Sequence, residues 1–421
     1  MINMFKKPDY INVIDGGICA VNNVKAAGTK KGKYGVSIIV SPNSNASAVF
    51  TTNKVVAAPI IHTKEVIKDG KLSAVIVNSG NANCFTGEQG IKDCDEIVSK
   101  ASELLNIPSS EIASSSTGVI GRKMPMDIIE PLIEEVSKNL DHSSQASLEA
   151  AKGIMTTDTV PKEFAVEVDI DGKPVKIGGI CKGTGMIAPN MGTMLCFLAT
   201  DAIIAPESIK LALKNAVDLS FNMIVVDGDE STNDTAILMA NGQSGVNVAD
   251  GGKINEKFQN ALSYLCVNLA QKMVRDGEGA SKFLEVNVHG ATSPEDAKLA
   301  AKAVASSMLF KAAVFGEDPN WGRIVSAVGY SGCDMNPDII SIAIGNESLF
   351  NKPNSDKSTY LVKNGEILAF DGTESLDMAE KLMANEDIIV DINLNLSDGE
   401  ATAWGCDLTY DYVKINGEYT T

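Results

Sequence analysis

The residues between Lys182 and Ala202 form the part of this sequence whose side-chain types best suit chemistry. The segment reads KGTGMIAPNMGTMLCFLATDA, and no charged side chain occurs between Lys182 and Asp201. A segment this apolar normally packs as core, yet this one carries hydroxyl and amide groups that a buried strand does not favour. Near its centre Thr193 follows Gly192, and this pair defines the chemistry to be tested.

A threonine that follows a glycine can cut its own chain. The Thr193 hydroxyl can attack the carbonyl of Gly192, which converts the peptide bond into an ester that water hydrolyses. The new N-terminal threonine has an α-amine with a pKa of about 8, and this amine can act as the base for the hydroxyl. Glycine suits the position before the cut because it tolerates strained backbone. The alternative is a buried strand with backbone-bonded hydroxyls, and the segment alone leaves both interpretations open.

Other polar segments could complete such a site. Ser116–Gly121, STGVIG, offers small residues with backbone N–H groups and a hydroxyl, which suit an oxyanion hole; by itself it favours a turn. Val77–Asn83, VNSGNAN, follows a strand-like run and predicts a polar loop. Asp318–Arg323, DPNWGR, also predicts a turn, from which Arg323 could hold a substrate carboxylate.

A different class of enzyme is suggested by an apolar run, MIVV, that ends in Asp227-Gly228-Asp229. A Mg²⁺-dependent phosphohydrolase presents its nucleophile, here Asp227, and its metal ligand, here Asp229, in this way. Such a site needs threonine or valine two residues later, where this chain has Ser231. The other interpretation is a polar loop that caps the end of a strand.

Several enzyme classes lack their motifs here. The histidines His62, His142 and His289 lie in no metal or triad motif, and there is no GxSxG or GxxxxGK[ST] sequence. Gly183–Ala188 matches GxGxxA, but Pro189 follows directly and would break the helix that a dinucleotide motif requires. The sequence therefore argues against serine hydrolases of the triad type, zinc enzymes and nucleotide-binding proteins.

The composition of the chain indicates its domain number, the partners it does not suit and its cellular location. The chain has 421 residues, of which 44% are apolar, so two or three domains or subdomains are expected. The net charge of −18 argues against nucleic acid and acidic membranes as partners. The eight cysteines are scattered, which predicts reduced thiols. Since no signal peptide or transmembrane run is apparent, we expect a soluble, cytoplasmic protein.

Strand-like and helix-like patterns alternate along the chain. Helical spacing of apolar residues extends over 91–105 and 258–273, and Ser293-Pro294 predicts the start of a helix toward Met308. Interleaved helices and strands predict the α/β class, with a C-terminal section beginning near the alternating run FLEVNVH at Phe283. The expected strands include 37–40, 74–77, 339–344 and 388–394.

Taken together, these segments resemble the ornithine acetyltransferases of arginine biosynthesis, also called glutamate N-acetyltransferases. Rare motifs that follow one another in the family's order carry the resemblance over nearly the whole chain. Asn416 and Thr421 near the C-terminus are part of it. The motifs are VNSGNAN at Val77, STGVIG at Ser116, KGTGMIAPNMGTML at Lys182, DGDESTND at Asp227, DGEGASK at Asp276 and EDPNWGR at Glu317.

The resemblance implies a precursor that cuts itself between Gly192 and Thr193, giving an α chain of residues 1–192 and a β chain of 193–421 that assemble as an α2β2 heterotetramer. It implies a four-layer α/β/β/α sandwich of two intertwined parts, with a smaller C-terminal α/β subdomain at roughly 284–410. This sequence departs from the family pattern at Gly192, where alanine is common, and at Glu230, where threonine is usual.

The resemblance also implies the reaction. Thr193 would take the acetyl group of N²-acetylornithine, release ornithine and pass the acetyl group to glutamate in a ping-pong scheme. No metal or cofactor is implied, although some members also accept acetyl-CoA as a co-substrate, and related self-cleaving proteins are amidases or aminopeptidases. The oxyanion hole maps onto the Thr117 hydroxyl and the Gly118 N–H. The implied substrate contacts are Thr156, Lys182, Thr193, Glu278, Asn416 and Thr421.

Overall fold

The structure is a computed structural model that describes residues 7–187, 194–352 and 355–418. The chain divides into two compact units. The first comprises Met1–Asn222 and Asp229–Met273, and the second comprises Met223–Gly228 and Val274–Thr421. Within the described ranges, no helix is long and apolar enough to cross a membrane.

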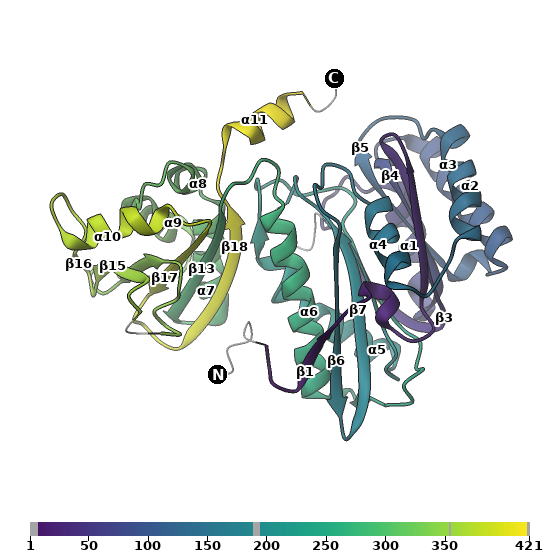
Figure 1. The fold of residues 1–421 in the computed structure, drawn as a ribbon, viewed down its shortest axis with the longest axis horizontal. Helices are drawn as coiled ribbons and strands as arrows, with labels where there is room; N and C mark the ends of the chain where they lie inside the picture. The colour runs from purple at the N-terminus through teal and green to yellow at the C-terminus, as the bar shows by residue number, and fades with distance from the viewer. Residues whose placement is uncertain (1–6, 188–193, 353–354, 419–421) are drawn as a thin grey trace. The chain divides into compact units, whose positions relative to one another are not determined.

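The first unit is built on one large mixed sheet (Figure 1). Its strands are β1 (Ile11–Ile14), β2 (Lys25–Lys31), β3 (Tyr34–Phe50), β4 (Lys71–Asn81), β5 (Ile112–Val119), β6 (Lys162–Ile170), β7 (Lys173–Lys182), β8 (Leu195–Thr200) and β10 (Thr235–Ala240). They follow the order β1-β6-β7-β8-β10-β3-β4-β5, and β2 pairs with β3. The pairs β4–β5 and β8–β10 are parallel. A separate hairpin joins β11 (Ala249–Asp250) to β12 (Lys253–Ile254).

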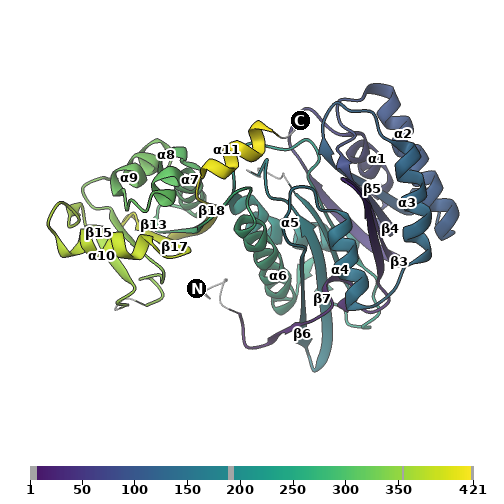
Figure 2. The ribbon, with the colours of Figure 1, turned by 45° about the horizontal axis from the view of Figure 1, so that its top comes forward.

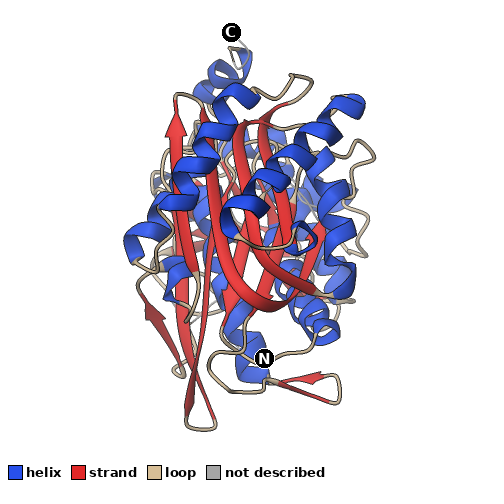
Figure 3. Ribbon diagram, turned by 90° about the vertical axis from the view of Figure 1, so that its right-hand side faces the viewer, coloured by secondary structure: helices blue, strands red, loops and turns tan. Residues whose placement is uncertain are grey.

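Helices lie across the strands of this sheet, as Figure 3 shows. They are α1 (Ala58–Val66), α2 (Gly87–Leu105), α3 (Met126–Lys138), α4 (Ser144–Gly153), α5 (Pro206–Asp218) and α6 (Glu256–Arg275), with short 3-10 turns at Gly17–Ala20, Ile67–Asp69, Ser109–Glu111 and Phe221–Met223. The helices predicted over 91–105 and 258–273 are confirmed as parts of α2 and α6. The predicted strands at 37–40 and 74–77 lie within β3 and β4.

The two faces of β3 and β4 pack against different layers, because successive side chains of a strand point in opposite directions. Ile38 and Ile76 join a core with α2 and α3, which flank these strands in both Figure 1 and Figure 2. The neighbouring Ile39 and Val75 join a second core that includes α4 and residues of β7, β8 and β10 such as Phe197. Strands from both halves of the sheet therefore share one buried layer.

Successive residues of β7 also point to opposite faces of the sheet, and one of these faces packs against α6. Ile180 contributes to the shared core, whereas its neighbours face α6. The Cys181 thiol lies 3.8 Å from the Leu269 carbonyl oxygen, and a Cβ on Gly179 would meet a Leu269 methyl at 3.3 Å. This close packing supports β7 up to its last residue, Lys182.

The second unit has its own mixed sheet, in the order β16-β15-β14-β17-β13-β18-β9. Its strands are β9 (Ile224–Val225), β13 (Phe283–Ala291), β14 (Ser341–Gly345), β15 (Ser358–Lys363), β16 (Glu366–Ile367), β17 (Asp387–Asn393) and β18 (Gly399–Cys406). Its helices are α7 (Pro294–Ser306), α8 (Met308–Phe315), α9 (Trp321–Tyr330), α10 (Glu374–Met383) and α11 (Tyr410–Gly417). The predicted cap of α7 is confirmed, since Ser293 Oγ accepts a hydrogen bond from the Asp296 N–H.

Candidate active site

The site in the first unit begins where the parallel strands β4 and β5 end. The sequence favours a turn at Ser116–Gly121 and a loop at Val77–Asn83, but the structure continues β5 to Val119 and β4 to Asn81. The predicted turn and loop are confined to residues 120–121 and 82–84, because the strands pair with each other up to these positions. Polar side chains along the paired ends also hydrogen-bond one another. Ser116 Oγ, for example, hydrogen-bonds Asn78 Oδ1 inside the sheet.

Gly118 occupies a position that only glycine can fill. Its φ is +134°, and a Cβ there would lie 2.3 Å from the Gly80 carbonyl carbon and 2.5 Å from the Asn81 nitrogen. The pairing of β4 with β5 shifts register at the same place. Such an irregularity re-aims the backbone, so the end of β5 presents Thr117 and Gly118 in a conformation distinct from an ordinary strand.

Buried amide side chains hold this strand end. Asn78 Nδ2 donates to the Asn81 carbonyl at 2.9 Å. Asn233 Nδ2 donates to the carbonyls of Ala82 at 2.6 Å and Ser116 at 2.8 Å. Sequence reasoning assigned Asn233 no role. The available signal was its motif, DGDESTND, which places an amide in a segment leading into a fully buried strand.

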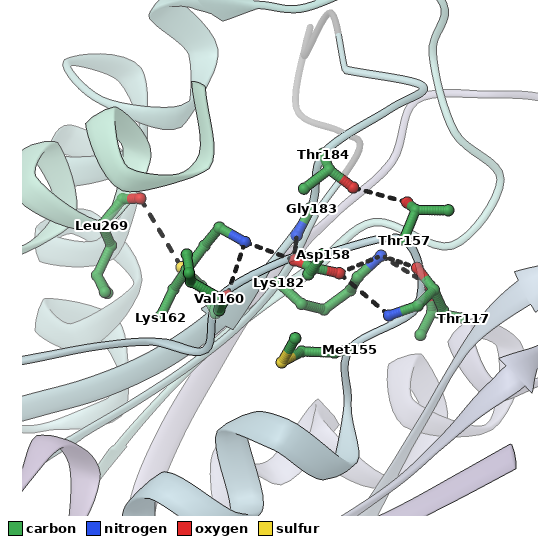
Figure 4. A network of polar contacts seen from close by, with 12 residues as sticks. Thr117, Met155, Thr157, Asp158, Val160, Lys162, Lys182, Gly183, Thr184 and Leu269 are labelled. Carbon is green, nitrogen blue, oxygen red and sulfur yellow. Dashed lines mark hydrogen bonds and ion pairs between the residues drawn. The ribbon is translucent and has the colours of Figure 1, made fainter. Parts of the chain in front are cut away.

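The structure brings Lys182 and Thr117 together, as Figure 4 shows, and Thr156 also contacts Lys182. Lys182 ends β7, Thr156 follows α4, and Thr117 lies near the end of β5. Lys182 Nζ donates to Thr156 Oγ1 at 2.8 Å and to Thr117 Oγ1 at 3.4 Å. The hydroxyls of two residues that the resemblance assigned to the site therefore lie beside the ammonium group of a third.

Asp158 is the residue in this cluster that sequence reasoning missed. Its carboxylate lies 2.7 Å from Lys162 Nζ and 3.6 Å from Lys182 Nζ. It also accepts hydrogen bonds from the backbone N–H of Gly183 at 2.9 Å and of Thr156 at 3.1 Å. Burial alone would raise the pKa of this carboxyl, but the charges of Lys182 and Lys162 outweigh burial and hold the pKa well below its usual range.

Two ammonium groups, those of Lys162 and Lys182, lie beside the single carboxylate of Asp158. The side chain of Asp158 is 0% exposed and that of Lys162 is 1% exposed, whereas that of Lys182 is 10% exposed. Lys182 is therefore the more exposed of the two lysine side chains. A partly buried ammonium beside hydroxyl groups suits a small carboxylate ligand.

The cysteine and histidine side chains do not offer a competing nucleophile or base in this cluster. Burial raises the pKa of the Cys181 thiol, next to Lys182, to about 12, so the reactive thiolate is disfavoured. His62 and His142 are engaged with the backbone carbonyls of Ile112 and Val24. Among the described residues, no three His, Cys, Asp or Glu side chains are grouped so as to hold a metal ion.

Glu278 and Asn416 meet within the second unit. Glu278 is 8% exposed and lies in the loop before β13. Asn416 Nδ2, on α11, donates to Glu278 Oε2 at 2.8 Å. Thr409 fixes α11 to the same loop, because its Oγ1 donates to the Gly279 carbonyl at 2.7 Å and caps the helix by accepting from the Tyr412 N–H. The described site residues are thus divided between the units, with Thr117, Gly118, Thr156 and Lys182 in the first and Glu278 and Asn416 in the second.

The remaining candidates take structural contacts or lie outside the description. Asp227 Oδ2 accepts a hydrogen bond from the Tyr412 hydroxyl at 3.2 Å. Arg323 lies in the first turn of α9 and donates to the Leu309 carbonyl at 2.6 Å, so the predicted turn is instead the start of a helix. Gly192, Thr193 and Thr421 lie outside the described residues.

The chain is similar in sequence to proteins of one enzyme family. The sequence model of the ArgJ family matches residues 21–421. The glutamate N-acetyltransferase of Methanothermobacter thermautotrophicus is 50% identical over 412 residues, which cover 98% of this chain and 99% of that protein. That of Methanocaldococcus jannaschii is 51% identical over 415 residues, covering 98% and 100%. A crystal structure of the arginine biosynthesis bifunctional protein ArgJ from Bacillus halodurans is 39% identical, with a TM-score of 0.48, and covers 54% of this chain and 100% of that one.

Proposed function

The chain belongs to the ArgJ family and is a glutamate N-acetyltransferase, and from this premise we propose that it moves the acetyl group of N²-acetylornithine to glutamate through an acetyl ester on Thr193. The single observation that carries the proposed site is the convergence of the Thr156 and Thr117 hydroxyls on the ammonium of Lys182. Family membership decides against the phosphohydrolase considered for Asp227 and Asp229.

The first half of the reaction loads the enzyme. The α-amine of Thr193 takes the proton of its own hydroxyl, and Oγ attacks the acetyl carbonyl carbon of acetylornithine. The resulting oxyanion receives hydrogen bonds from the Thr117 hydroxyl and the Gly118 N–H, a kind of donor whose removal costs about 10²–10³ in kcat. When the carbon–nitrogen bond breaks, the protonated amine returns the proton to the leaving nitrogen, and ornithine departs.

The second half unloads it. The neutral amine of glutamate attacks the ester carbonyl, and the same donors stabilise the second oxyanion. The α-amine of Thr193 takes the proton that the attacking nitrogen loses and gives it to the departing Thr193 oxygen. Lys182 is suited to the α-carboxylate of either substrate, because its ammonium lies beside the Thr156 and Thr117 hydroxyls and its side chain is more exposed than that of Lys162. Thr156 lies beside that ammonium. Glu278 is suited to the side-chain ammonium of ornithine, with Asn416 and Thr421 as further contacts. Acetyl-CoA would serve as a second donor in a bifunctional enzyme.

Processing, assembly and layering belong to the same proposal. Cleavage between Gly192 and Thr193 would give chains 1–192 and 193–421, joined as α2β2, with a C-terminal subdomain at roughly 284–410. The core shared by strands of both halves of the large sheet, with helices α2, α3 and α6 on its outer sides, supports a four-layer α/β/β/α sandwich.

Intact mass under denaturing conditions tests the nucleophile. We expect two species from the 44.4 kDa precursor, one ending at Gly192 and one starting at Thr193, and a single species from Thr193→Ala. The processed enzyme should transfer acetyl from acetylornithine to glutamate, and Thr193→Ala should not. Full transfer by Thr193→Ala would refute the mechanism, whereas release of acetate without glutamate would favour an amidase.

A further inference from the structure

The ammonium of Lys182 has partners on two sides. On one side lie the Asp158 carboxylate, 3.6 Å away, and the Thr156 hydroxyl, which accepts its hydrogen bond at 2.8 Å. On the other side Lys182 donates to Thr117 Oγ1 at 3.4 Å. Figure 4 shows this line of contacts from Asp158 through Lys182 to Thr117. The contact with Thr117 has a consequence for the direction of that residue's hydroxyl hydrogen.

A hydroxyl group has one hydrogen to donate and two lone pairs that accept. An ammonium has no lone pair, so Lys182 can only donate to Thr117 Oγ1 and the Thr117 hydrogen must turn away from it. Within the described part of the chain, no hydrogen bond is donated by the Thr117 hydroxyl to another group. Its hydrogen is therefore available for a ligand, and the neighbouring cation makes that hydrogen a stronger donor.

We infer that Lys182, anchored by Asp158, is a positioning residue for Thr117: it turns the Thr117 hydroxyl into a directed donor for the oxyanion. This role is separate from the binding of a substrate carboxylate, and it rests on the proposed function of Thr117. It also assigns a role to Asp158, which holds both the Lys182 side chain and the Gly183 backbone.

Asp158 is equipped to keep Lys182 in one place. A lysine side chain has many rotamers, and losing that freedom costs up to about 2 kcal/mol. Asp158 lies beside the ammonium, bonds the next residue's N–H, and is itself held by Lys162 Nζ at 2.7 Å. Because Asp158 is fully buried, solvent does not compete for these contacts. Lys182 is thus fixed before any substrate arrives.

A donor without a carboxylate separates the two roles of Lys182. The probe is p-nitrophenyl acetate, whose acetyl group can acylate the processed enzyme and release p-nitrophenolate. If Lys182 served only a substrate carboxylate, Lys182→Met would leave this acylation unchanged. On the inference, Lys182→Met slows acylation about tenfold, Asp158→Asn slows it by a similar factor, and Lys182→Arg, which keeps a cationic donor, stays within about threefold of wild type.

A double-mutant cycle tests whether the effect passes through Thr117. Thr117→Val removes the hydroxyl and should slow acylation about 100-fold. In that background Lys182→Met should add less than a twofold change. A full further tenfold loss in the double variant, or unchanged acylation in Lys182→Met alone, would overturn the inference.

Three controls keep the outcome interpretable. Lys272→Met removes an exposed lysine of α6 that donates to the Glu163 carbonyl and should leave acylation unchanged. Each acylation rate is divided by the fraction of processed enzyme, which intact mass measures. If Lys182→Met is not processed, Asp158→Asn replaces it in the double-mutant cycle. Wild-type transfer from acetylornithine to glutamate, and its loss in Thr193→Ala, test the proposed function separately. If the Lys182→Met and Thr117→Val effects are additive in an enzyme whose transfer activity is intact, the inference about Lys182 and Thr117 is refuted, whereas the proposed function stands.

Discussion

The Asn416 side-chain amide donates a hydrogen bond to Glu278 Oε2 at 2.8 Å, which joins α11 to a loop that lies 138 positions earlier in the chain. The amide occupies one lone pair of the carboxylate and orients the group. Thr409 holds the other end of the helix by donating to the Gly279 carbonyl. The C-terminal helix therefore sets the direction in which the remaining Glu278 oxygen can accept.

Replacing Asn416 by alanine should weaken substrate binding more than catalysis. A hydrogen bond to a charged group contributes about 1.5–3 kcal/mol, so we expect Asn416→Ala to raise KM for acetylornithine about tenfold and to change kcat less than threefold. Steady-state kinetics of transfer check this. Lys414→Ala, at an exposed position of the same helix, is the matched control. A loss confined to kcat would contradict the proposed role of Glu278 as a substrate contact.

A methyl group at Gly118 should abolish transfer. The φ of +134° and the approach of a Cβ to within 2.5 Å of the Gly80–Asn81 backbone force this strand end to move. We expect Gly118→Ala to lower kcat by at least about 100-fold, the effect of losing one oxyanion donor. Gly172→Ala is the matched control, since Gly172 also has a positive φ, +79°, but has nothing within 4 Å of a Cβ. Normal kcat in Gly118→Ala would remove Gly118 from the oxyanion site.

Removing the Asn233 amide should loosen the same strand end. Asn233→Ala leaves the buried carbonyls of Ala82 and Ser116 without their donor, and each such group costs about 1–3 kcal/mol. Denaturant unfolding should show a loss of about 2 kcal/mol, together with slower transfer. Asn139→Ala, which removes an exposed amide contact to the Glu135 carbonyl, should change stability by less than about 0.5 kcal/mol. Equal stability of the two variants would mean that Asn233 does not support β5.

Asp391 predicts a pH dependence in the second unit. Burial raises the pKa of its carboxyl to about 6, although it accepts hydrogen bonds from Asn287, Ser348 and the Leu349 N–H. Because the folded-state pKa is raised, Asp391 makes its full favourable contribution to folding stability below the unfolded-state pKa near 4. That contribution is lost as pH rises through about 6.

The free energy of unfolding is expected to fall by about 2 kcal/mol between pH 4 and pH 7. Denaturant unfolding of wild type and Asp391→Asn at both pH values measures it, because the asparagine does not titrate. The variant should gain stability relative to wild type as pH rises. A difference that stays constant over this range would show that Asp391 keeps an ordinary pKa.

Local elements could be predicted from the sequence, because their causes are local. The apolar spacing of α2 and the Ser293 cap of α7 depend on residues within a few turns of one another, and both are confirmed. The strands β4 and β5 were expected to end too early. Their polar ends, such as Ser116, read as turns in isolation, but pairing inside the sheet satisfies their hydrogen-bonding groups.

Asp158 and Asn233 could not be assigned from sequence patterns. Asp158 lies between α4 and β6 and contacts the Lys182 ammonium and the Gly183 N–H, which follow on the far side of the β6–β7 hairpin. Asn233 acts on Ser116, 117 positions away. No periodicity or short motif relates such positions, because their contacts arise only when strands from distant parts of the chain become neighbours.

The sequence by itself determined the family and the kinds of group available: a threonine after a glycine, a lysine at the end of a strand, and hydroxyl-rich segments in a fixed order. Only the tertiary structure decided that the Thr156 and Thr117 hydroxyls lie beside the ammonium of Lys182 and that a buried carboxylate holds it. The physical reason is that burial, register and strand order are set by the whole sheet. The strength and direction of each charge and hydrogen bond follow from those long-range contacts.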